Sequence, residues 1–259
     1  MDLYTFSEWL ADAPEWFQSW PEWIQNLFYQ LYQTFIYDDR YMLFLNGLKI
    51  TFIVTIGALI LGVIIGLIIA IVRVSHDSIT NKKPNIFLRI VNRICMWYLT
   101  IVRGTPMMVQ LLIMGFVIMV PQTEFDCIMC AIVTLGINSG AYVAEIVRSG
   151  IMSVDKGQME AGRSIGFNYI QTMWHVIIPQ AVKNILPALG NEMITLLKDT
   201  SLVSVISLRD VTLQAKNVMS LSYQVYVPYI SLAVIYLVIV IIMTKLLGML
   251  ERRLNKNER

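Results

Sequence analysis

Long apolar runs separated by shorter polar stretches set the pattern of this chain. A helix needs about 20 predominantly apolar residues to cross the hydrocarbon core of a bilayer. Runs of this character predict an all-α membrane protein with about five transmembrane helices. We expect the spans at about 48–72, 94–120, 127–147, 188–206 and 227–247.

The composition supports lipid as the surroundings of these helices. Of the 259 residues, 56% are hydrophobic and 15% are charged, whereas soluble domains have about 45–50% apolar and about 25% charged residues. The formal net charge is only +2, and no basic stripe alternates with aromatic residues. We therefore expect membrane lipid, and no nucleic acid, as a partner.

Two glycines four residues apart lie in the first predicted span. Gly62 and Gly66 form a GxxxG pair, and such a pair lets another helix approach closely. The pair fits tight packing inside one subunit, and it also fits a contact between two subunits.

The distribution of basic residues predicts the orientation. The connection after the first span and the tail at 252–259 are rich in Lys and Arg, as cytoplasmic segments are. Five spans put the termini on opposite sides, so we expect the N-terminus outside and the C-terminus in the cytoplasm. The basic residues of that connection are Arg73, His76, Lys82, Lys83, Arg89 and Arg93.

Residues 1–41 precede the apolar region and differ from it. They are aromatic and amphipathic, and Pro14 and Pro21 interrupt them. Trp and Tyr favour the membrane interface, so we expect an interfacial helix on the outer face. A weakly ordered leader is the alternative. The predicted domains are thus 1–41, a transmembrane domain at 42–251 and a basic cytoplasmic tail at 252–259.

A polar, glycine-punctuated stretch interrupts the apolar pattern at 160–179. Asp155 suits a helix N-cap, and Gly166 suits the left-handed position after a helix end. Asn168 can start a second helix, which we expect to stop near Pro179. Two short helices joined at a glycine form either a docking surface or an amphipathic loop on lipid.

Charged residues inside predicted spans indicate a cavity or a partner, because charges are costly in hydrocarbon. Arg103 lies just before Thr105 and Pro106, and Pro106 should free a backbone carbonyl. Arg103 either faces a transport pathway or pairs with Glu145 near the inner surface. Glu145 either holds a substrate amino group or is an interfacial residue.

The fourth predicted span has one continuously polar face. A helical repeat brings its polar residues to one side, and such a helix cannot face lipid. The face either lines a water-filled path for a substrate with both a donor and an acceptor, or it forms a polar contact between subunits. Its residues are Asn191, Glu192, Thr195, Lys198, Asp199, Thr200 and Ser201.

The stretch 160–179 resembles the EAA loop of the membrane subunits of ATP-binding cassette (ABC) importers. That pattern is Glu-Ala-Ala, three residues, Gly, nine residues, then Ile-x-Leu-Pro. The chain departs from it by small or conservative changes, namely Gly162 for the second Ala, Val176 for Ile and Ile178 for Leu. Its matching positions are Glu160, Ala161, Gly166 and Pro179.

The resemblance extends over most of the chain from about Leu48. RGTPMMVQ (103–110), AYVAEIVRSGI (141–151) and LLKDTSLVSVI (196–206) are similar to segments of the polar amino acid permeases of that superfamily. The resemblance implies the transmembrane fold of a type I ABC importer in a bacterial inner or plasma membrane. It also implies five spans, an outside N-terminus and an inside C-terminus.

The same resemblance implies a coupling role. The first short helix would insert into a cleft on a dimer of separate ATPase subunits, which would bind the ATP and Mg. This chain would be no enzyme and hold no cofactor, and it has no phosphate-loop motif. An amino acid, an external binding protein and a second or related permease are the other implied partners. The coupling residues would be Glu160, Ala161, Gly162, Arg163, Ser164 and Gly166.

Three other functions are weighed against this one. An ion-coupled secondary carrier needs ionisable groups deep in several spans, and a structural membrane subunit needs no pathway. An intramembrane hydrolase is excluded because His76 and His175 fall in connections and no two carboxylates face each other within a span. The cysteines, Cys95, Cys127 and Cys130, form neither a disulfide framework nor a zinc site.

Overall fold

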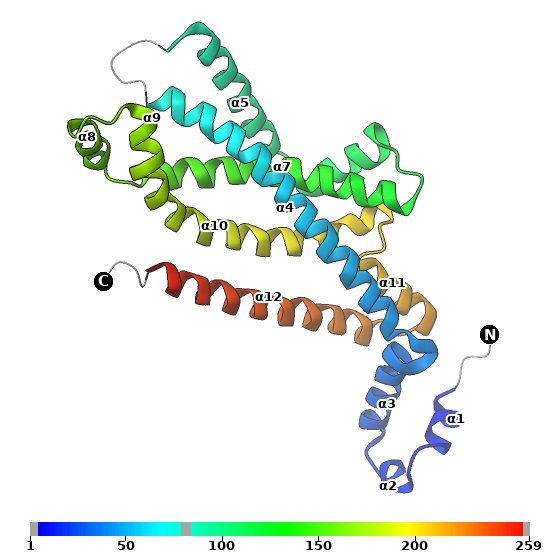
Figure 1. The fold of residues 1–259 in the computed structure, drawn as a ribbon. Helices are drawn as coiled ribbons and strands as arrows, with labels where there is room; N and C mark the ends of the chain where they lie inside the picture. The colour runs from blue at the N-terminus through cyan, green and yellow to red at the C-terminus, as the bar shows by residue number, and fades with distance from the viewer. Residues whose placement is uncertain (1–4, 79–83, 256–259) are drawn as a thin grey trace. The chain divides into compact units, whose positions relative to one another are not determined.

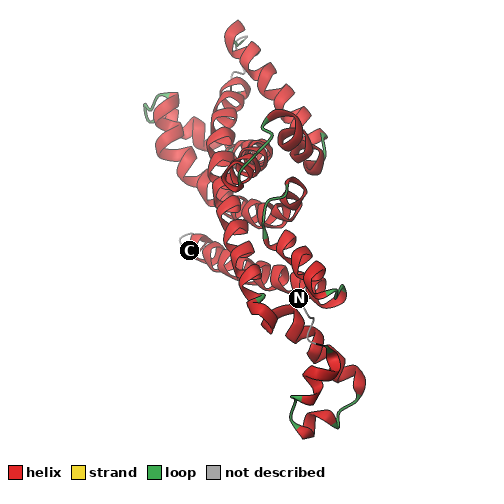
Figure 2. Ribbon diagram, turned by 90° about the vertical axis from the view of Figure 1, so that its right-hand side faces the viewer, coloured by secondary structure: helices red, strands yellow, loops and turns green. Residues whose placement is uncertain are grey.

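The structure is a computed structural model that describes residues 5–78 and 84–255. The predicted cytoplasmic lysines Lys82 and Lys83, and the end of the basic tail at 256–259, lie outside the described residues. Helices joined by short loops make up the described part of the chain, which contains no strand (Figure 2). The all-α fold class is confirmed.

The chain divides into two compact units, each described by itself. The first comprises Met1–Ile50 and Arg209–Leu237, and the second comprises Thr51–Leu208 and Val238–Arg259. Two long helices, α4 (Tyr41–Asp77) and α12 (Tyr226–Asn255), contribute to both units (Figure 1). The predicted domain boundary at residue 41 stays a prediction.

The first unit is built around a small apolar core. Phe44 at the start of α4 packs with Val211, Ala215 and Val218. Gly47 allows this close approach, because a Cβ atom there would lie 2.7 Å from the Cα atom of Val211. The unit's other helices are α1 (Phe6–Ala11), α2 (Glu15–Gln18), α3 (Glu22–Leu31), the π-helix η1 (Tyr32–Ile36), the 3-10 helix η2 (Tyr37–Asp39) and α11 (Val211–Ser222).

A buried carboxylate caps α11. The Oδ1 atom of Asp210 accepts a hydrogen bond of 3.0 Å from the Leu213 amide, and Oδ2 accepts one of 3.0 Å from the Thr212 amide. Burial raises the pKa of Asp210 to about 6, although the cap hydrogen bonds and the charge of Lys216 lower it. Desolvation of the carboxylate therefore outweighs the cap in setting this pKa.

This pKa predicts how stability depends on pH. In the unfolded chain an Asp titrates near about 4, so the folded state holds the proton more tightly. The stabilisation is fully present below about pH 4 and is lost as the pH rises to about 6, by about 3 kcal/mol. Asp210→Asn removes the charge and keeps one of the two cap hydrogen bonds, because its side-chain nitrogen cannot accept. Its thermal stability in detergent should stay flat over this range and exceed that of the wild type at pH 7.5, since one hydrogen bond is worth only about 0.5–1.5 kcal/mol. A wild-type stability that does not fall between pH 4 and 6.5 contradicts the prediction.

The second unit contains most of the long helices. In Figure 1, α7 and α10 run side by side. The unit's helices, besides its parts of α4 and α12, are α5 (Ile86–Gly104), α6 (Met107–Ile113), the π-helix η3 (Met114–Ile118), α7 (Glu124–Met152), α8 (Lys156–Ser164), α9 (Tyr169–Thr172), the π-helix η4 (Met173–Ile177), α10 (Ile178–Asp199) and the 3-10 helix η5 (Thr200–Ile206).

The glycines of the first predicted span pack against α7. A Cβ atom on Gly62 would lie 3.0 Å from the Ser139 side chain, and one on Gly66 would lie 2.6 Å from the Val143 side chain. Both glycines thus let α4 and α7 touch closely. The interpretation of GxxxG as packing within one subunit is confirmed.

Within the described residues, three helices, α4, α7 and α12, are long and apolar enough to cross a membrane by length and composition. The predicted span at 94–120 is broken, since the helices at Ile86–Gly104 and Met107–Ile118 meet at 104°. They make a fourth candidate if they count as one span. The span at 188–206 falls on α10 and η5, so the count of five stays a prediction.

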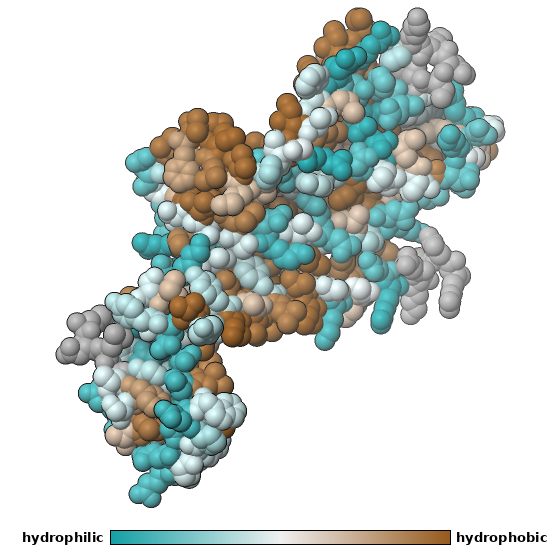
Figure 3. Space-filling model, turned by 180° about the vertical axis from the view of Figure 1, so that it is seen from behind, coloured by the Kyte–Doolittle hydropathy of each residue, from teal (hydrophilic) through white to brown (hydrophobic). Residues whose placement is uncertain are grey.

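Exposed apolar side chains mark the surfaces that lipid would cover. Hydrophobic residues occupy large areas of the face seen in Figure 3. On α12, exposed large side chains recur along the helix, and water would solvate such a surface poorly. They include Ile230, Val234, Leu237, Val238, Ile241, Ile242 and Leu246.

Candidate functional site

The connection between α7 and α10 contains the predicted docking segment. Asp155 caps α8, because its side chain accepts a hydrogen bond of 2.6 Å from the Gly157 amide. After α8, the Phe167 amide donates to the Gly162 carbonyl and the Gly166 amide donates to the Arg163 carbonyl. This is a Schellman end, with Gly166 at φ +98°. The predicted cap and the predicted glycine end are confirmed.

A second helix starts where the sequence predicted it. Asn168 caps α9 and forms a reciprocal capping box with Gln171. The prediction that this helix stops near Pro179 is wrong, because α9 continues through η4 into α10. Pro179 sits in the first turn of α10, just after the π-helix, where a missing amide hydrogen costs little.

Close packing fixes α8 against α9. Gly162 is buried, and a Cβ atom on it would lie 2.5 Å from the Cγ2 atom of Thr172. Thr172 is itself fully buried and donates to the Asn168 carbonyl over 3.0 Å. The glycine that replaces the second alanine of the EAA pattern is therefore a packing residue.

The other predicted coupling residues are exposed. Glu160, Ala161, Arg163 and Ser164 lie on the surface of α8, and the Ser164 hydroxyl donates to the Glu160 carbonyl. Three large apolar side chains that follow in the sequence are also exposed, and the sequence analysis did not single them out. They are Ile165, Ile170 and Trp174.

Contacts tie this connection and the end of α7 to α4. The Tyr169 hydroxyl on α9 donates to the Ser78 hydroxyl, just after α4, over 2.9 Å. Glu145 on α7 accepts from Arg73 on α4 at 2.9 Å, and it also pairs with Arg148. The docking segment is thus connected to two of the long helices.

A polar cavity of about 560 Å³ lies within the second unit. It brings together Arg103, which lies at the end of α5, and the Glu192, Thr195 and Asp199 side of α10. Thus one cation and two carboxylates, distant in sequence, share one hollow. Its lining residues are Arg103, Gly104, Thr105, Pro106, Met107, Asn138, Tyr142, Glu192, Thr195 and Asp199.

Aromatic and hydroxyl neighbours position the charged groups of the cavity. The Arg103 guanidinium lies 5.4 Å from the centre of the Tyr142 ring, a cation–π distance. The Ser139 hydroxyl donates to Glu192 Oε1 over 2.7 Å. The arrangement offers a donor group and two acceptor groups to an amphoteric ligand.

The sharp bend between α5 and α6 forms one wall of the cavity. Pro106 ends α5, and the Gln110 amide nitrogen donates to the Val102 carbonyl at 2.8 Å and to the Thr105 carbonyl at 3.2 Å. The Gln110 oxygen accepts from Asn138 at 3.0 Å. The freed carbonyl that Pro106 predicted is present, and Gln110, which the sequence analysis missed as a cap, satisfies it.

Gln110→Leu should loosen this wall. The change removes hydrogen bonds worth about 0.5–1.5 kcal/mol each, so unfolding should become easier by about 2–3 kcal/mol. Thermal unfolding of the purified protein in detergent measures this. Gln122→Leu is the matched control, because Gln122 is exposed and bonds only locally. Equal unfolding temperatures for the two variants contradict the role of Gln110.

The remaining predicted pathway residues occupy different places. Among the ion pairs of the described residues, Glu145 pairs with Arg73 and Arg148 and not with Arg103. Glu145 and Arg103 line a second, neighbouring cavity of about 540 Å³. Asn191 and Lys198 are exposed, Thr200 is buried and Ser201 is half-buried, and none of these four lines the first cavity.

Neither cavity offers an obvious metal site. Within 5–78 and 84–255, no three His, Cys, Asp or Glu side chains are grouped as metal ligands would be.

Residues 84–256 match the family model described as "Binding-protein-dependent transport system inner membrane component". The chain belongs to this family of inner membrane transport components. It is therefore a multi-pass membrane permease subunit of an ABC importer, without an enzymatic function of its own. The resemblance noted above is thereby confirmed. The permease is supported over the secondary carrier, the structural membrane subunit and the hydrolase.

The matches between this permease subunit and its curated relatives cover nearly the whole length of those relatives. The arginine transport system permease protein ArtQ of Bacillus subtilis is 37% identical over 217 residues, which is 83% of this chain and 93% of that protein. The glutamine transport system permease protein GlnP of Escherichia coli K12 is 33% identical over 214 residues, 82% of this chain and 93% of that protein.

Solved structures show the same fold. A chain from the crystal structure of an amino acid ABC transporter with histidines is 42% identical, with a TM-score of 0.73 over 82% of this chain and 94% of that chain. A chain of the inward-facing MetNI methionine ABC transporter has a TM-score of 0.70 over 82% of this chain and 96% of its own length, at 18% identity. The expected type I ABC importer fold is confirmed.

Proposed function

We propose that this permease subunit forms part of the membrane pathway for a polar amino acid. The observation that carries the proposal is the cavity that joins Arg103 with Glu192 and Asp199. A zwitterion presents a carboxylate and an ammonium group, and this cavity offers a cation for the first and carboxylates for the second. The names of the relatives, which refer to arginine and glutamine, agree with an amino acid substrate.

The proposed coupling surface is the exposed side of α8 around Glu160, with Gly166 at its end. A separate ATPase dimer, which binds ATP and Mg, would dock there. Ile165, Ile170 and Trp174, at and after the end of α8, are all exposed. Large apolar side chains exposed in a polar segment support docking to a protein. The termini would lie as the charge pattern predicts, with this segment in the cytoplasm.

A second permease subunit would complete the pathway. Asn191 and Lys198 are exposed on α10, and polar side chains on a membrane helix need a partner or water. A second copy of this chain or a related permease would cover them, and an external binding protein would deliver the substrate. A path shared by two subunits also explains why part of the polar face lies outside the cavity.

Reconstitution tests the proposal. The purified chain alone should neither take up amino acids into vesicles nor hydrolyse ATP, whereas the complex with its ATPase should do both. A thermal-shift screen of the complex over the amino acids then identifies the ligand class. Uptake by the isolated chain would contradict the proposal. So would an ATPase complex that shows neither a thermal shift nor uptake with any amino acid.

A further inference from the structure

The N-terminal segment, residues 5–36, folds its aromatic side chains against one another. Phe17, which is buried, lies at the centre of the group, with its ring 5.4 Å from that of Trp20 and 5.5 Å from that of Phe28. Trp9 and Trp16 meet the Phe17 ring nearly at right angles, at 89° and 86°. Rings in such relative orientations direct their π faces in several directions.

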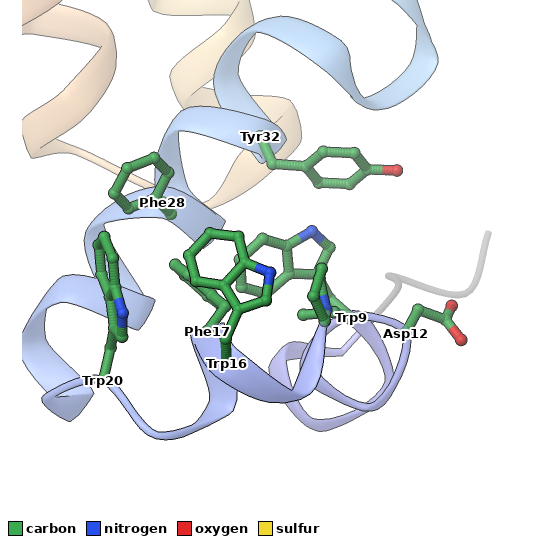
Figure 4. Close-up of a pocket in the computed structure, with 9 residues that line it drawn as sticks. Trp9, Asp12, Trp16, Phe17, Trp20, Phe28 and Tyr32 are labelled. Carbon is green, nitrogen blue, oxygen red and sulfur yellow. The ribbon is translucent and has the colours of Figure 1, made fainter.

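These rings line a cavity of about 470 Å³ (Figure 4), which is a size typical of small-molecule sites. Figure 4 shows Trp20 at one end, Trp16 in the middle and the Asp12 carboxylate at the other end. Trp16 is 63% exposed, so a ligand from solution can reach it. The lining residues are Trp9, Asp12, Ala13, Pro14, Trp16, Phe17, Trp20, Phe28 and Tyr32.

The sequence of this segment and of the residues on either side of it is strongly acidic. Arg40 is the first basic side chain of the sequence, and it is buried, where it donates to the Gln33 carbonyl and lies over the Tyr37 ring. The potential around the pocket therefore favours a cation. The acidic residues before Arg40 are Asp2, Glu8, Asp12, Glu15, Glu22, Asp38 and Asp39.

We propose that this aromatic pocket binds a quaternary ammonium group. The faces of Trp, Tyr and Phe rings attract a desolvated cation, and cages of such rings recognise this group. Asp12 and Tyr32 are the lining residues with a side-chain oxygen. A guanidinium or primary ammonium brings several N–H donors that these oxygens would leave unsatisfied, whereas a quaternary ammonium brings none.

Contact with an anionic membrane surface explains the segment less well. Amphipathic helices that lie on membranes carry Lys and Arg on their polar face, and anionic lipids repel carboxylates. This segment has the opposite charge. It also lies outside residues 84–256, the part that matches the permease family, so the inference does not depend on the proposed transport function.

Choline binding to the full-length protein in a maltoside detergent tests the proposal. Four of the six tryptophans, Trp9, Trp16, Trp20 and Trp23, lie in this segment, so Trp fluorescence reports on the pocket. Choline should change the fluorescence in a saturable way. Its neutral isostere, 3,3-dimethyl-1-butanol, should bind at least about 5-fold more weakly, because it lacks the cation–π attraction. Equal binding of the two overturns the proposal.

Two variants locate the binding. Trp16→Leu should weaken choline binding by about 3- to 30-fold, the range expected for one cation–π contact. The matched control is Trp23→Leu, since Trp23 is 70% exposed in the same segment and does not line the pocket. Asp12→Asn should also weaken binding and reduce its dependence on salt. Equal loss in Trp16→Leu and Trp23→Leu overturns the assignment to this pocket.

Lipid vesicles distinguish a lipid headgroup from a soluble ligand as the source of the quaternary ammonium group. A Trp16-dependent change with phosphatidylcholine and none with phosphatidylglycerol supports the proposal with a lipid headgroup as the source. A response to free choline supports it with a soluble ligand. An equal response to both lipids, unaffected by Trp16→Leu, overturns the proposal and identifies the segment as a general interface anchor.

Discussion

Glu160→Lys should abolish ATP-driven uptake while the protein still inserts into the membrane. Asp155, Lys156, Glu160 and Arg163 leave the α8 region with balanced charge, and the change adds two positive units to an exposed surface. Loss or reversal of one charge of an ion pair at an interface costs about 2–5 kcal/mol of binding free energy. The affinity for the ATPase should therefore fall by about 30-fold or more. Uptake into vesicles and co-purification of the ATPase measure both effects.

Controls separate docking from folding in this experiment. Glu124→Lys makes the same charge reversal at the opposite end of α7, on an exposed carboxylate, and should leave uptake near the wild-type rate. The expression level and thermal stability of Glu160→Lys should match those of the wild type. Wild-type uptake by Glu160→Lys would show that α8 is not the coupling surface.

Glu192→Leu should remove most uptake without releasing the ATPase. The change takes one of two carboxylates from the cavity and leaves the Ser139 hydroxyl without its acceptor. Loss of a charge partner for a substrate ammonium costs about 2–5 kcal/mol, so substrate affinity should fall by about 30-fold or more. Uptake as a function of substrate concentration, with the ATPase bound, measures this.

Two milder variants assign the cause. Glu192→Gln keeps an oxygen for the Ser139 hydroxyl but removes the charge, so it should lose affinity nearly as Glu192→Leu does. Ser139→Ala keeps the charge and should lose much less. If Glu192→Gln retains full affinity, or Glu192→Leu transports normally, the carboxylate does not recognise the substrate.

Local rules predicted the docking segment well. A carboxylate at Asp155, a glycine at Gly166 and an amide at Asn168 each act on backbone groups within a few residues. Such features depend little on the rest of the fold, so the sequence alone identifies them. The prediction that the helix ends near Pro179 was wrong because proline is also tolerated in the first turn of a helix. Pro179 lies in the first turn of α10, directly after the π-helix η4.

The cavity was predictable only in part. The helical repeat placed Glu192, Thr195 and Asp199 on one side of α10, as the structure shows. Periodicity within one helix cannot reveal which other segment faces that side, so the approach of Arg103 depended on the bend before Pro106. The capping role of Gln110 was missed for the same reason, since it reaches carbonyls five and eight residues away.

The aromatic pocket lay beyond prediction from the pattern. The sequence of residues 1–41 indicated a surface-seeking aromatic segment, whereas the structure turns several of these rings toward one another. Ring-to-ring packing depends on the turns at Pro14 and Pro21, which set the directions of three short helices. Composition gives the rings and the charge, and only the fold gives the cavity.

The absence of a loop between η4 and α10 has a mechanical consequence. The helical chain from Tyr169 to Asp199 is uninterrupted, and at 1.5 Å per residue it extends about 45 Å. Its first turn adjoins the surface that would receive an ATPase, and its last turns contribute two carboxylates to the cavity. If an ATPase docks as proposed, a displacement imposed at one end of this helical chain would reach the other end without crossing a loop. The wide turn of η4 and Pro187 are the places where the helix would bend.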